Sequence, residues 1–204
     1  MKPSALSLPG YKVNEYLLVL SPHEALRNKI KEIKEEFFQK YQSPTVRWGK
    51  PHITLVRFQQ YAMTEERIVN RLQTVAMGYY PFKVELKDFG SFPSHTIFIN
   101  VTTKEPVRSL VRELRPFQQL LKLNTENKPH FIDEPHLPIA RKLIPWQYEK
   151  GWLEYSRKHF TGRFIADGML LLRRQLGGDK NYQVLKRFEF MNLPVSTRQG
   201  ELFG

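Results

Sequence analysis

The sequence contains no cysteine. Disulfide bonds and thiolate metal sites are therefore excluded, and the composition is compatible with a reducing compartment. No apolar run approaches the roughly 20 residues that a membrane-spanning helix needs. Residues 1–16 lack the continuous apolar segment of a secretory signal. We therefore expect a cytoplasmic protein that does not enter a membrane.

Acidic residues are few beside basic ones. Twenty Asp and Glu stand against 32 Lys and Arg, which gives a formal net charge of +12 and a pI near 9.9. Such a surplus favours polyanionic partners, nucleic acid and nucleotides first among them. A basic protein without such a partner is the alternative at this point, because net charge does not locate a patch.

The remaining composition is that of an ordinary globular protein, with 41% hydrophobic, 13% aromatic and 25% charged residues in a chain of 204. That length allows a sizeable core. The sequence shows no stretch rich enough in Gly, Pro or Ser to link independent domains. We therefore expect residues 1–204 to form one domain of two lobes, with a tail from about residue 193.

The apolar pattern alternates between strand and helix signals. An apolar run at 15–22 is typical of a buried strand, and the apolar spacing from Leu26 to Phe37 predicts a helix that ends near Tyr41. The same criteria predict strands over 52–58, 82–90, 96–101, 136–143, 162–175 and 181–190, and helices over 65–76, 107–117 and 145–159. After a first strand, the order helix, strand, helix, strand pair occurs twice, which indicates an α+β protein with two related halves.

A short phrase occurs once in each half. Residues 51–58 read PHITLVRF and residues 135–141 read PHLPIAR, so each copy places Pro before its histidine and Arg five positions after it. On a strand, His52 and Thr54 share one face about 7 Å apart. An imidazole exchanges a proton near neutral pH, and a hydroxyl donates to a phosphate oxygen. Two such strands across a cleft supply the base and the acid that displacement at phosphorus needs without a metal.

Four segments carry a family resemblance: HITL at 52–55, HLPIAR at 136–141, FGSFPSHTIFINV at 89–101 and the hairpin sequence over 169–190. They are similar to the 2H phosphoesterase superfamily, the HxTx-motif group that contains the 2′-5′ RNA ligase-like proteins and the 2′,3′-cyclic phosphodiesterases. The resemblance implies a bilobal, pseudo-two-fold fold. Two four-stranded antiparallel sheets would line a central cleft, each with one motif on an inner strand, and helices would pack outside.

The resemblance also implies roles for individual residues. His52 and His136 would be the catalytic pair, with the choice of base left open. Thr54 would hold phosphate oxygens, and Arg141 would add positive charge to the phosphate site or tether the neighbouring nucleotide. No metal and no cofactor is implied.

Three aromatic residues are candidates for substrate contact, and each has a structural alternative. Trp48 is placed to stack on a base or to pack on its own lobe. Phe92 is placed to line the cleft or to pack in the core. Tyr182 reaches the substrate, as the resemblance implies, or is an exposed strand tyrosine.

The second motif departs from the family pattern, because Pro138 stands where the family has Thr or Ser. Proline has no donor, and the loss of one donor to an oxyanion costs on the order of 2–3 kcal/mol. It also favours a strand edge or a bulge at this point. The arginines raise a second question, since position +5 faces away from His on a regular strand. Arg141 therefore needs a bulge or a strand end to reach the phosphate.

The sequence thus predicts a hydrolase, a metal-independent phosphodiesterase for 2′,3′-cyclic phosphates or 2′-5′-linked RNA or nucleotides. Its partners would be RNA ends or small nucleotides, and a monomer is favoured. A catalytically weakened protein that only binds RNA ends or nucleotides is the first alternative, suggested by Pro138. A basic structural protein with accidental motifs is the second.

Overall fold

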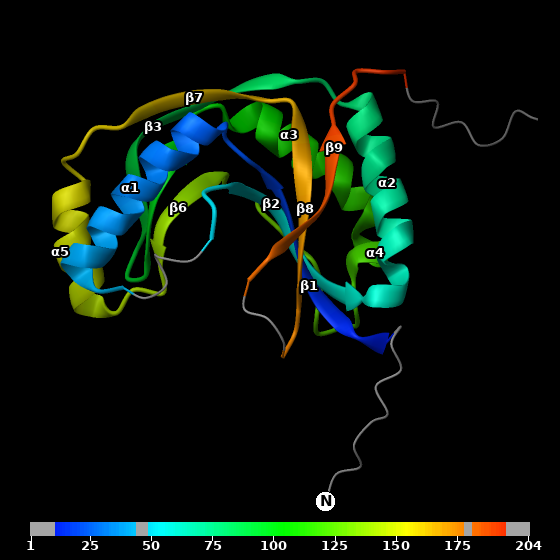
Figure 1. Cartoon of the computed structure of the whole chain (residues 1–204), viewed down its shortest axis with the longest axis horizontal. Helices are drawn as coiled ribbons and strands as arrows, with labels where there is room; N and C mark the ends of the chain where they lie inside the picture. Colours follow the sequence, from blue (N-terminus) through cyan, green and yellow to red (C-terminus); the bar gives the residue numbers. More distant parts are fainter. Residues whose placement is uncertain (1–10, 44–48, 178–180, 195–204) are drawn as a thin grey trace, which may run out of the picture.

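A computed structural model of the chain describes residues 11–43, 49–177 and 181–194. Figure 1 shows its α+β architecture. The strands are β1 (Val13–Leu20), β2 (Ile53–Tyr61), β3 (Phe82–Phe92), β4 (Thr96–Val101), β5 (His130–Phe131), β6 (His136–Arg141), β7 (Thr161–Ala166), β8 (Gly168–Gln175) and β9 (Gln183–Glu189). The α-helices are α1 (Glu24–Tyr41), α2 (Glu65–Gly78), α3 (Lys104–Leu114), α4 (Gln118–Leu121) and α5 (Pro145–Tyr155), and two short 3-10 helices are η2 (Ala62–Thr64) and η3 (Arg115–Phe117).

The described strands form two antiparallel sheets, which confirms the predicted fold class. One sheet has the order β5-β2-β1-β8-β9 and the other the order β6-β4-β3-β7. The expectation of four strands in each sheet is corrected by β5, which pairs its two residues with Val56 and Arg57. The stretch around β5 is mostly polar, so a two-residue strand leaves no periodic signal there.

The strand predicted over 162–175 is in fact two strands in different sheets. β7 pairs with β3, and β8 pairs with β1 and β9. The chain changes sheet at Asp167 and Gly168. A Cβ on Gly168 would lie 2.4 Å from the carbonyl oxygen of Phe188, so only glycine permits this approach of the two backbones. Sequence periodicity continues across the crossover, and it therefore could not mark the break.

Each sheet combines strands from both halves of the sequence. β1 and β2 share a sheet with the late β8 and β9 through the pairing of β1 with β8, whereas β3 pairs with the late β7 and β4 with the late β6. The first histidine motif consequently lies in the five-stranded sheet and the second in the four-stranded sheet. The two similar sequence segments at 51–58 and 135–141 therefore lie in different sheets.

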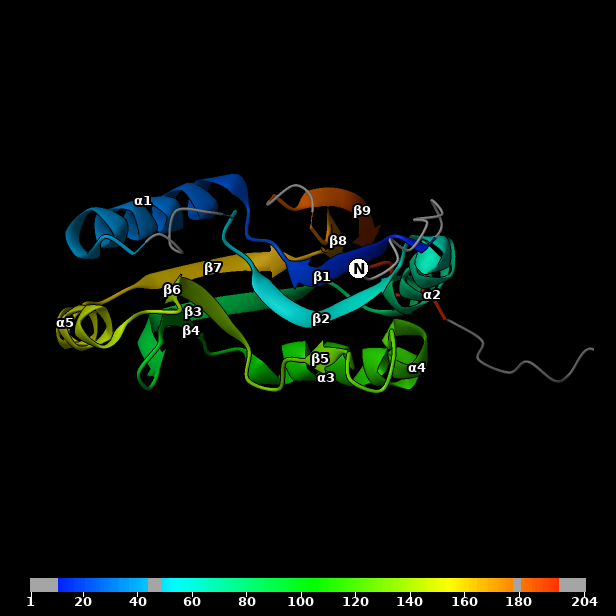
Figure 2. The same cartoon turned by 90° about the horizontal axis from the view of Figure 1, so that it is seen from below.

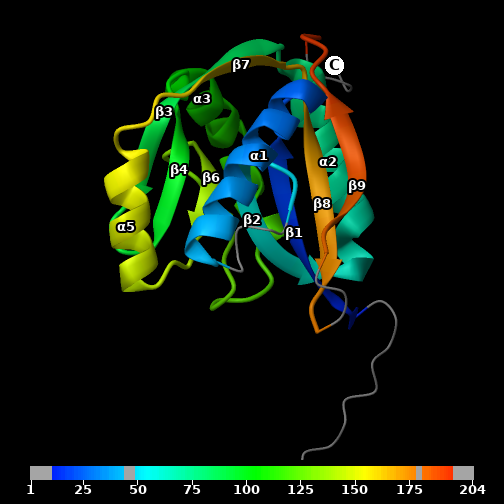
Figure 3. The same cartoon turned by 60° about the vertical axis from the view of Figure 1, so that its left-hand side comes forward.

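Apolar helix faces cover the sheets. The inner face of α3 is buried through Val107, Leu110, Val111 and Leu114. α3 and α4 contact β2, while α1 contacts β6 and β7. Figure 1 places α1 and α5 at one end of the molecule and α2 and α4 at the other, and Figure 3 again shows α5 and α2 on opposite sides. Figure 2 shows α3 and α4 on one side of the strands and α1 on the other.

One cluster of buried apolar residues extends through both sheets. In the described ranges no helix is long and apolar enough to cross a membrane. The predicted domain boundaries, with a tail from about residue 193, stay a prediction.

Candidate active site

The two motif strands share the same irregularity. Val19 pairs with Thr54 and Leu18 with Val56, so Leu55 is an extra residue in β2. In β6, Pro138 pairs with Phe98 and Ala140 with Ile97, which leaves Ile139 as the extra residue. Leu55 and Ile139 both stand three positions after their histidines. A bulge of this kind sets two residues against one and shifts the alternation of the strand.

The bulges decide which way the arginines face. Along both strands the histidine and position +2 are partly exposed, positions +1, +3 and +4 are buried, and the arginine at +5 is exposed. A regular strand would send position +5 to the face opposite the histidine. The extra residue returns Arg57 and Arg141 to the histidine face. Arg141 thus has the bulge that it needs to lie on the same face as the histidine.

The strand positions of the two motifs differ. β2 lies between β5 and β1, whereas β6 is the edge strand of its sheet. The expectation of an inner strand is therefore wrong for the second motif. Pro138 explains the difference, because a residue without an N–H is tolerated at an edge or a bulge, and β6 has both.

Both histidines are held by the same hydrogen bond. The Nδ1 atom of His52 lies 2.8 Å from the carbonyl oxygen of Lys50, and that of His136 lies 2.8 Å from the carbonyl oxygen of Glu134. A carbonyl only accepts, so Nδ1–H donates in each pair. Nε2 is then the nitrogen that can take a proton, and both rings present it in the same tautomer.

The surroundings lower the pKa of both imidazoles. Burial lowers the pKa of His52 to about 4, against the hydrogen bond to Lys50, and the charges of Arg141 and Lys34 act in the same direction as burial. Burial also lowers the pKa of His136, again with a contribution from Arg141. Arg141 therefore lies within electrostatic reach of both histidines, although they come from different sheets.

A cleft of about 810 Å³ opens beside His52. It is lined by residues from β1, α1, the segment just before β2, β6 and the β8–β9 hairpin: Leu17, Lys31, Glu32, Lys34, Glu35, Gly49, Lys50, Pro51, His52, Pro138, Ile139, Arg141, Leu172, Arg174, Asn181, Tyr182 and Val184. The cleft thus brings together His52, Arg141 and Tyr182 from three distant parts of the sequence. His136 and Thr54 are not part of this lining.

His136 lies between two aromatic rings, two positions before Pro138, which lines the cleft. The ring of Phe92 meets it edge-on at 4.8 Å between centroids, and the ring of Phe98 lies 5.1 Å away. Phe92 thus contacts the second motif histidine directly. The other aromatic candidate near a motif, Trp48, lies outside the described residues.

Five basic side chains line the cleft beside two carboxylates: Lys31, Lys34, Lys50, Arg141 and Arg174, with Glu32 and Glu35. The Lys34 ammonium donates to the carbonyl oxygen of Gly49 at 3.2 Å. Burial lowers its pKa to about 8, and Arg141 and Lys31 add to the shift. Burial likewise lowers the pKa of Arg141. Positive charges that lower the pKa of Lys34 mark a place where an anion such as phosphate is favoured.

A buried carboxylate on β1 binds three side chains, two of which line the cleft. Glu15 on β1 is fully buried, and it accepts hydrogen bonds from Tyr182 Oη at 2.6 Å and from Arg174 Nε at 2.6 Å. Arg57 Nε donates to its other oxygen at 2.5 Å. Burial raises the pKa of Glu15, but these three partners outweigh it and hold the pKa below its usual range. Glu15 therefore engages Arg57 and fixes Tyr182 at the cleft.

Sequence reasoning missed Glu15, Lys34 and Arg174. A signal existed for Glu15, since an acid at the start of the apolar run at 15–22 is unusual for a buried strand. Lys34 lies on a helix rich in charge, where lysines are ordinarily solvated. In the part of the chain that the structure describes, no three His, Asp or Glu side chains are grouped as metal ligands.

Comparison with known proteins identifies the family. Residues 22–178 match the model of the 2′-5′ RNA ligase superfamily, and the chain belongs to this family. The predicted membership is thereby confirmed. No curated protein matches the sequence significantly.

Solved structures share the fold at low identity. The TT0787 protein of Thermus thermophilus is 19% identical with a TM-score of 0.64, over 87% of this chain and 98% of that one. E. coli LigT in its apo form is 14% identical with a TM-score of 0.61, over 88% and 98%. E. coli LigT complexed with 3′-AMP is 16% identical with a TM-score of 0.60, over 88% and 99%. At such identities these likenesses show the fold alone.

Proposed function

We propose that the protein is a metal-independent phosphodiesterase that hydrolyses 2′,3′-cyclic phosphates or 2′-5′ linkages of RNA or nucleotides. One observation carries the proposal. Two histidines from different sheets each donate Nδ1–H to a backbone carbonyl and keep Nε2 for proton transfer, beside a cationic cleft. Family membership supports an enzyme of this kind. The LigT structure with 3′-AMP supports a nucleotide ligand.

The proposed reaction needs one base and one acid. Nε2 of His52 takes a proton from water, the water oxygen bonds to phosphorus, and the bond from phosphorus to the leaving ribose oxygen breaks. The imidazolium of His136 gives its proton to that oxygen. We assign the base to His52 because Arg141 and Lys34 disfavour its charged form. Glu134 favours the charged form of His136, which suits the acid.

The phosphate would be held by cations and one hydroxyl. Arg141 from the second motif and Lys34 from α1 face the cleft. Thr54 shares the face of His52 and offers its hydroxyl to a phosphate oxygen. Pro138 offers no donor at the matching place, and we assign Lys34 as the group that supplies positive charge there.

Aromatic residues complete the proposed site. Tyr182 lines the cleft, where its ring can stack on a base while its hydroxyl stays bound to Glu15. Burial and the Glu15 carboxylate raise the pKa of Tyr182, so the hydroxyl remains protonated. Phe92 holds the ring of His136 in place. A base contact by Trp48 stays a prediction from the sequence, as do the monomeric state and the cytoplasmic location.

Hydrolysis of 2′,3′-cyclic nucleotides in EDTA tests the proposal. We expect His52→Ala and His136→Ala each to lower kcat/KM by about 10²- to 10⁴-fold, because each removes a proton-transfer step. His95→Ala is the matched control. Nδ1 of His95 lies 2.9 Å from the carbonyl oxygen of Pro93, the same local geometry, but His95 stands in the turn between β3 and β4, outside both histidine motifs. Equal losses in all three variants would show that the imidazoles act only in folding.

The second candidate function is binding without turnover. It is favoured by Pro138, which removes one donor from the site. In that case wild type binds a phosphorylated RNA end but hydrolyses nothing, and both histidine variants keep the affinity. Fluorescence anisotropy of a labelled RNA that ends in a cyclic phosphate separates the two functions.

A further inference from the structure

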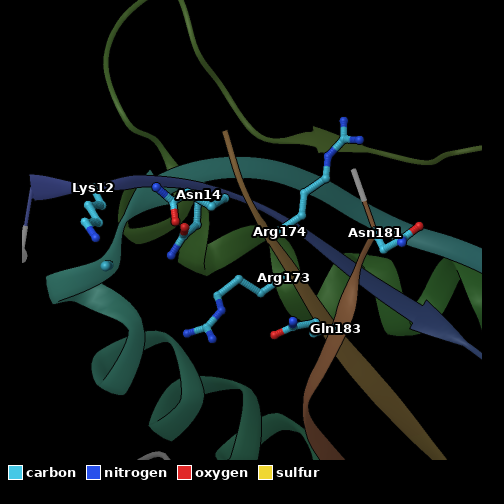
Figure 4. Close-up of a pocket in the computed structure, with 8 residues that line it drawn as sticks. Lys12, Asn14, Arg173, Arg174, Asn181 and Gln183 are labelled. Atoms are coloured by element: carbon cyan, nitrogen blue, oxygen red, sulfur yellow. The ribbon is translucent and has the colours of Figure 1, made fainter. Parts of the chain in front are cut away.

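A second, smaller cavity of about 300 Å³ lies at the ends of β1, β8 and β9 (Figure 4). We call it the hairpin pocket, and it is lined by Lys12, Asn14, Ala62, Arg173, Arg174, Gln175, Asn181 and Gln183. The lining holds cations and side-chain amides, one alanine and no carboxylate. Amides donate and accept at once, and cations attract phosphate, so this lining suits a nucleotide.

Strand pairing and hydrogen bonds hold several residues that line the hairpin pocket. Asn14 is opposite Gln175 on the neighbouring strand, and Arg173 is opposite Gln183. Asn14 Nδ2 donates to Tyr16 Oη at 3.3 Å, and Tyr16 Oη donates to Glu65 at 3.1 Å.

The charges of the pocket do not cancel. Arg173 donates to the carboxylate of Glu65 at 3.0 and 3.2 Å, so these two charges compensate each other. Within the described ranges Lys12 makes no ion pair. Its ammonium therefore remains as surplus positive charge, while Asn14 is held with only 7% of its surface exposed.

The pocket adjoins the candidate active site. Arg174 and Asn181 line both cavities. Figure 4 shows the side chains of Arg173 and Arg174 leaving β8 in opposite directions. Along the hairpin, Tyr182 lines the active-site cleft and Gln183 lines the hairpin pocket. One short stretch of chain thus separates the two cavities and contributes to each.

We propose that the hairpin pocket binds a nucleotide of the same RNA strand whose cyclic-phosphate end occupies the cleft. The substrate is then a single-stranded RNA end and not a mononucleotide. The inference rests on the proposed function and narrows its substrate class. Lys12 meets a phosphate of the strand, and the amides of Asn14 and Gln183 meet base or ribose edges, which a single strand leaves accessible.

The test compares two substrates, 2′,3′-cyclic AMP and a short single-stranded RNA with a 2′,3′-cyclic phosphate end. We expect a lower KM for the RNA. Lys12→Gln and Gln183→Ala should each raise the KM for the RNA by about three- to tenfold and leave that for cyclic AMP unchanged. For Lys12→Gln, the slope of log KM against log salt with the RNA should also fall by about 0.7, the value for one phosphate contact on a single strand.

Lys87→Gln is the control, since it removes the same charge from β3 and Lys87 lines neither cavity. The inference is overturned if the two substrates have equal KM, or if the pocket variants change both KM values alike. Absence of turnover with either substrate contradicts the proposed function instead. RNA binding by anisotropy then tests the pocket alone, where Lys12→Gln must weaken affinity more than Lys87→Gln does.

Discussion

The two motif strands share two backbone features but differ in their side chains and surroundings. Both carry a histidine bound to the carbonyl oxygen two residues earlier, and both have a bulge at position +3. Yet the first strand has Thr54 at position +2 and the second has Pro138. The geometry of a duplicated motif is thus preserved in the backbone, while its chemistry has diverged between the two copies.

The arginines show the same divergence. Arg57 is engaged by the buried Glu15, whereas Arg141 lines the cleft and affects the pKa of both histidines. Matching places in the two motifs therefore hold a structural arginine and a candidate phosphate-binding arginine. Glu15 makes the difference, because it draws one of the two arginines into a buried network. The two copies can be compared by mutation, position by position.

The largest expected difference is between the two arginines. Arg141→Met should lower kcat/KM for 2′,3′-cyclic AMP by about 10²- to 10³-fold, because a charge aimed at the transition-state phosphate is lost. Arg57→Met should lower it by less than about fivefold, since Arg57 acts on Glu15, which keeps Tyr182 and Arg174 as partners. Steady-state kinetics on both variants measures the contrast. Similar losses would show that Arg57 also reaches the phosphate.

The motif histidines could be predicted from the sequence because they recur with the same neighbouring residues. The helices could be predicted because their apolar residues recur with helical spacing. It could not place Arg141, since the direction of position +5 depends on one extra residue in the strand. Leu55 and Ile139 look like any apolar strand residues, and only pairing with β1 and β4 makes them bulges.

Long-range contacts account for what the sequence left open at the site. Lys34 is a candidate for the phosphate site only because α1 packs against β6. The break between β7 and β8 is set by the contact of Gly168 with Phe188, a residue 20 positions later. The local sequence pattern does not predict such contacts, because they join elements that are distant in the chain.

The second prediction concerns position +2 of the two motifs. Thr54→Val should lower kcat/KM by roughly 30- to 200-fold, the effect of one lost donor to an oxyanion. Pro138→Thr should raise it by less than about threefold in wild type if Lys34 already supplies the charge. In the Lys34→Met background, Pro138→Thr should raise kcat/KM by about tenfold. Such a dependence of one substitution on another is typical of groups that act at one site.

A double-mutant cycle on kcat/KM measures that coupling. Lys31→Met serves as the control background, because Lys31 also lines the cleft from α1. An effect of Pro138→Thr that is equal in all three backgrounds would contradict the assignment of Lys34. Thermal melting of each variant separates loss of fold from loss of function.

The smallest expected effect concerns the pH dependence of kcat/KM, in which each histidine sets one limb of the profile. A base must be neutral, so kcat/KM should fall as the pH drops through the pKa of His52, about 4. An acid must be protonated, so kcat/KM should also fall as the pH rises through the lowered pKa of His136. The optimum for the free enzyme therefore lies below the ordinary histidine pKa of about 6.5.

Lys34→Met sharpens this assignment. The Lys34 charge lowers the pKa of His52 and is not among the causes that shift the pKa of His136, so its removal should move only the acidic limb, to higher pH. Lys31→Met should leave that limb in place, because Lys31 acts on Lys34 and not on His52. If the alkaline limb moves instead, His136 is the base and His52 the acid, and the proton transfers run in the opposite sense.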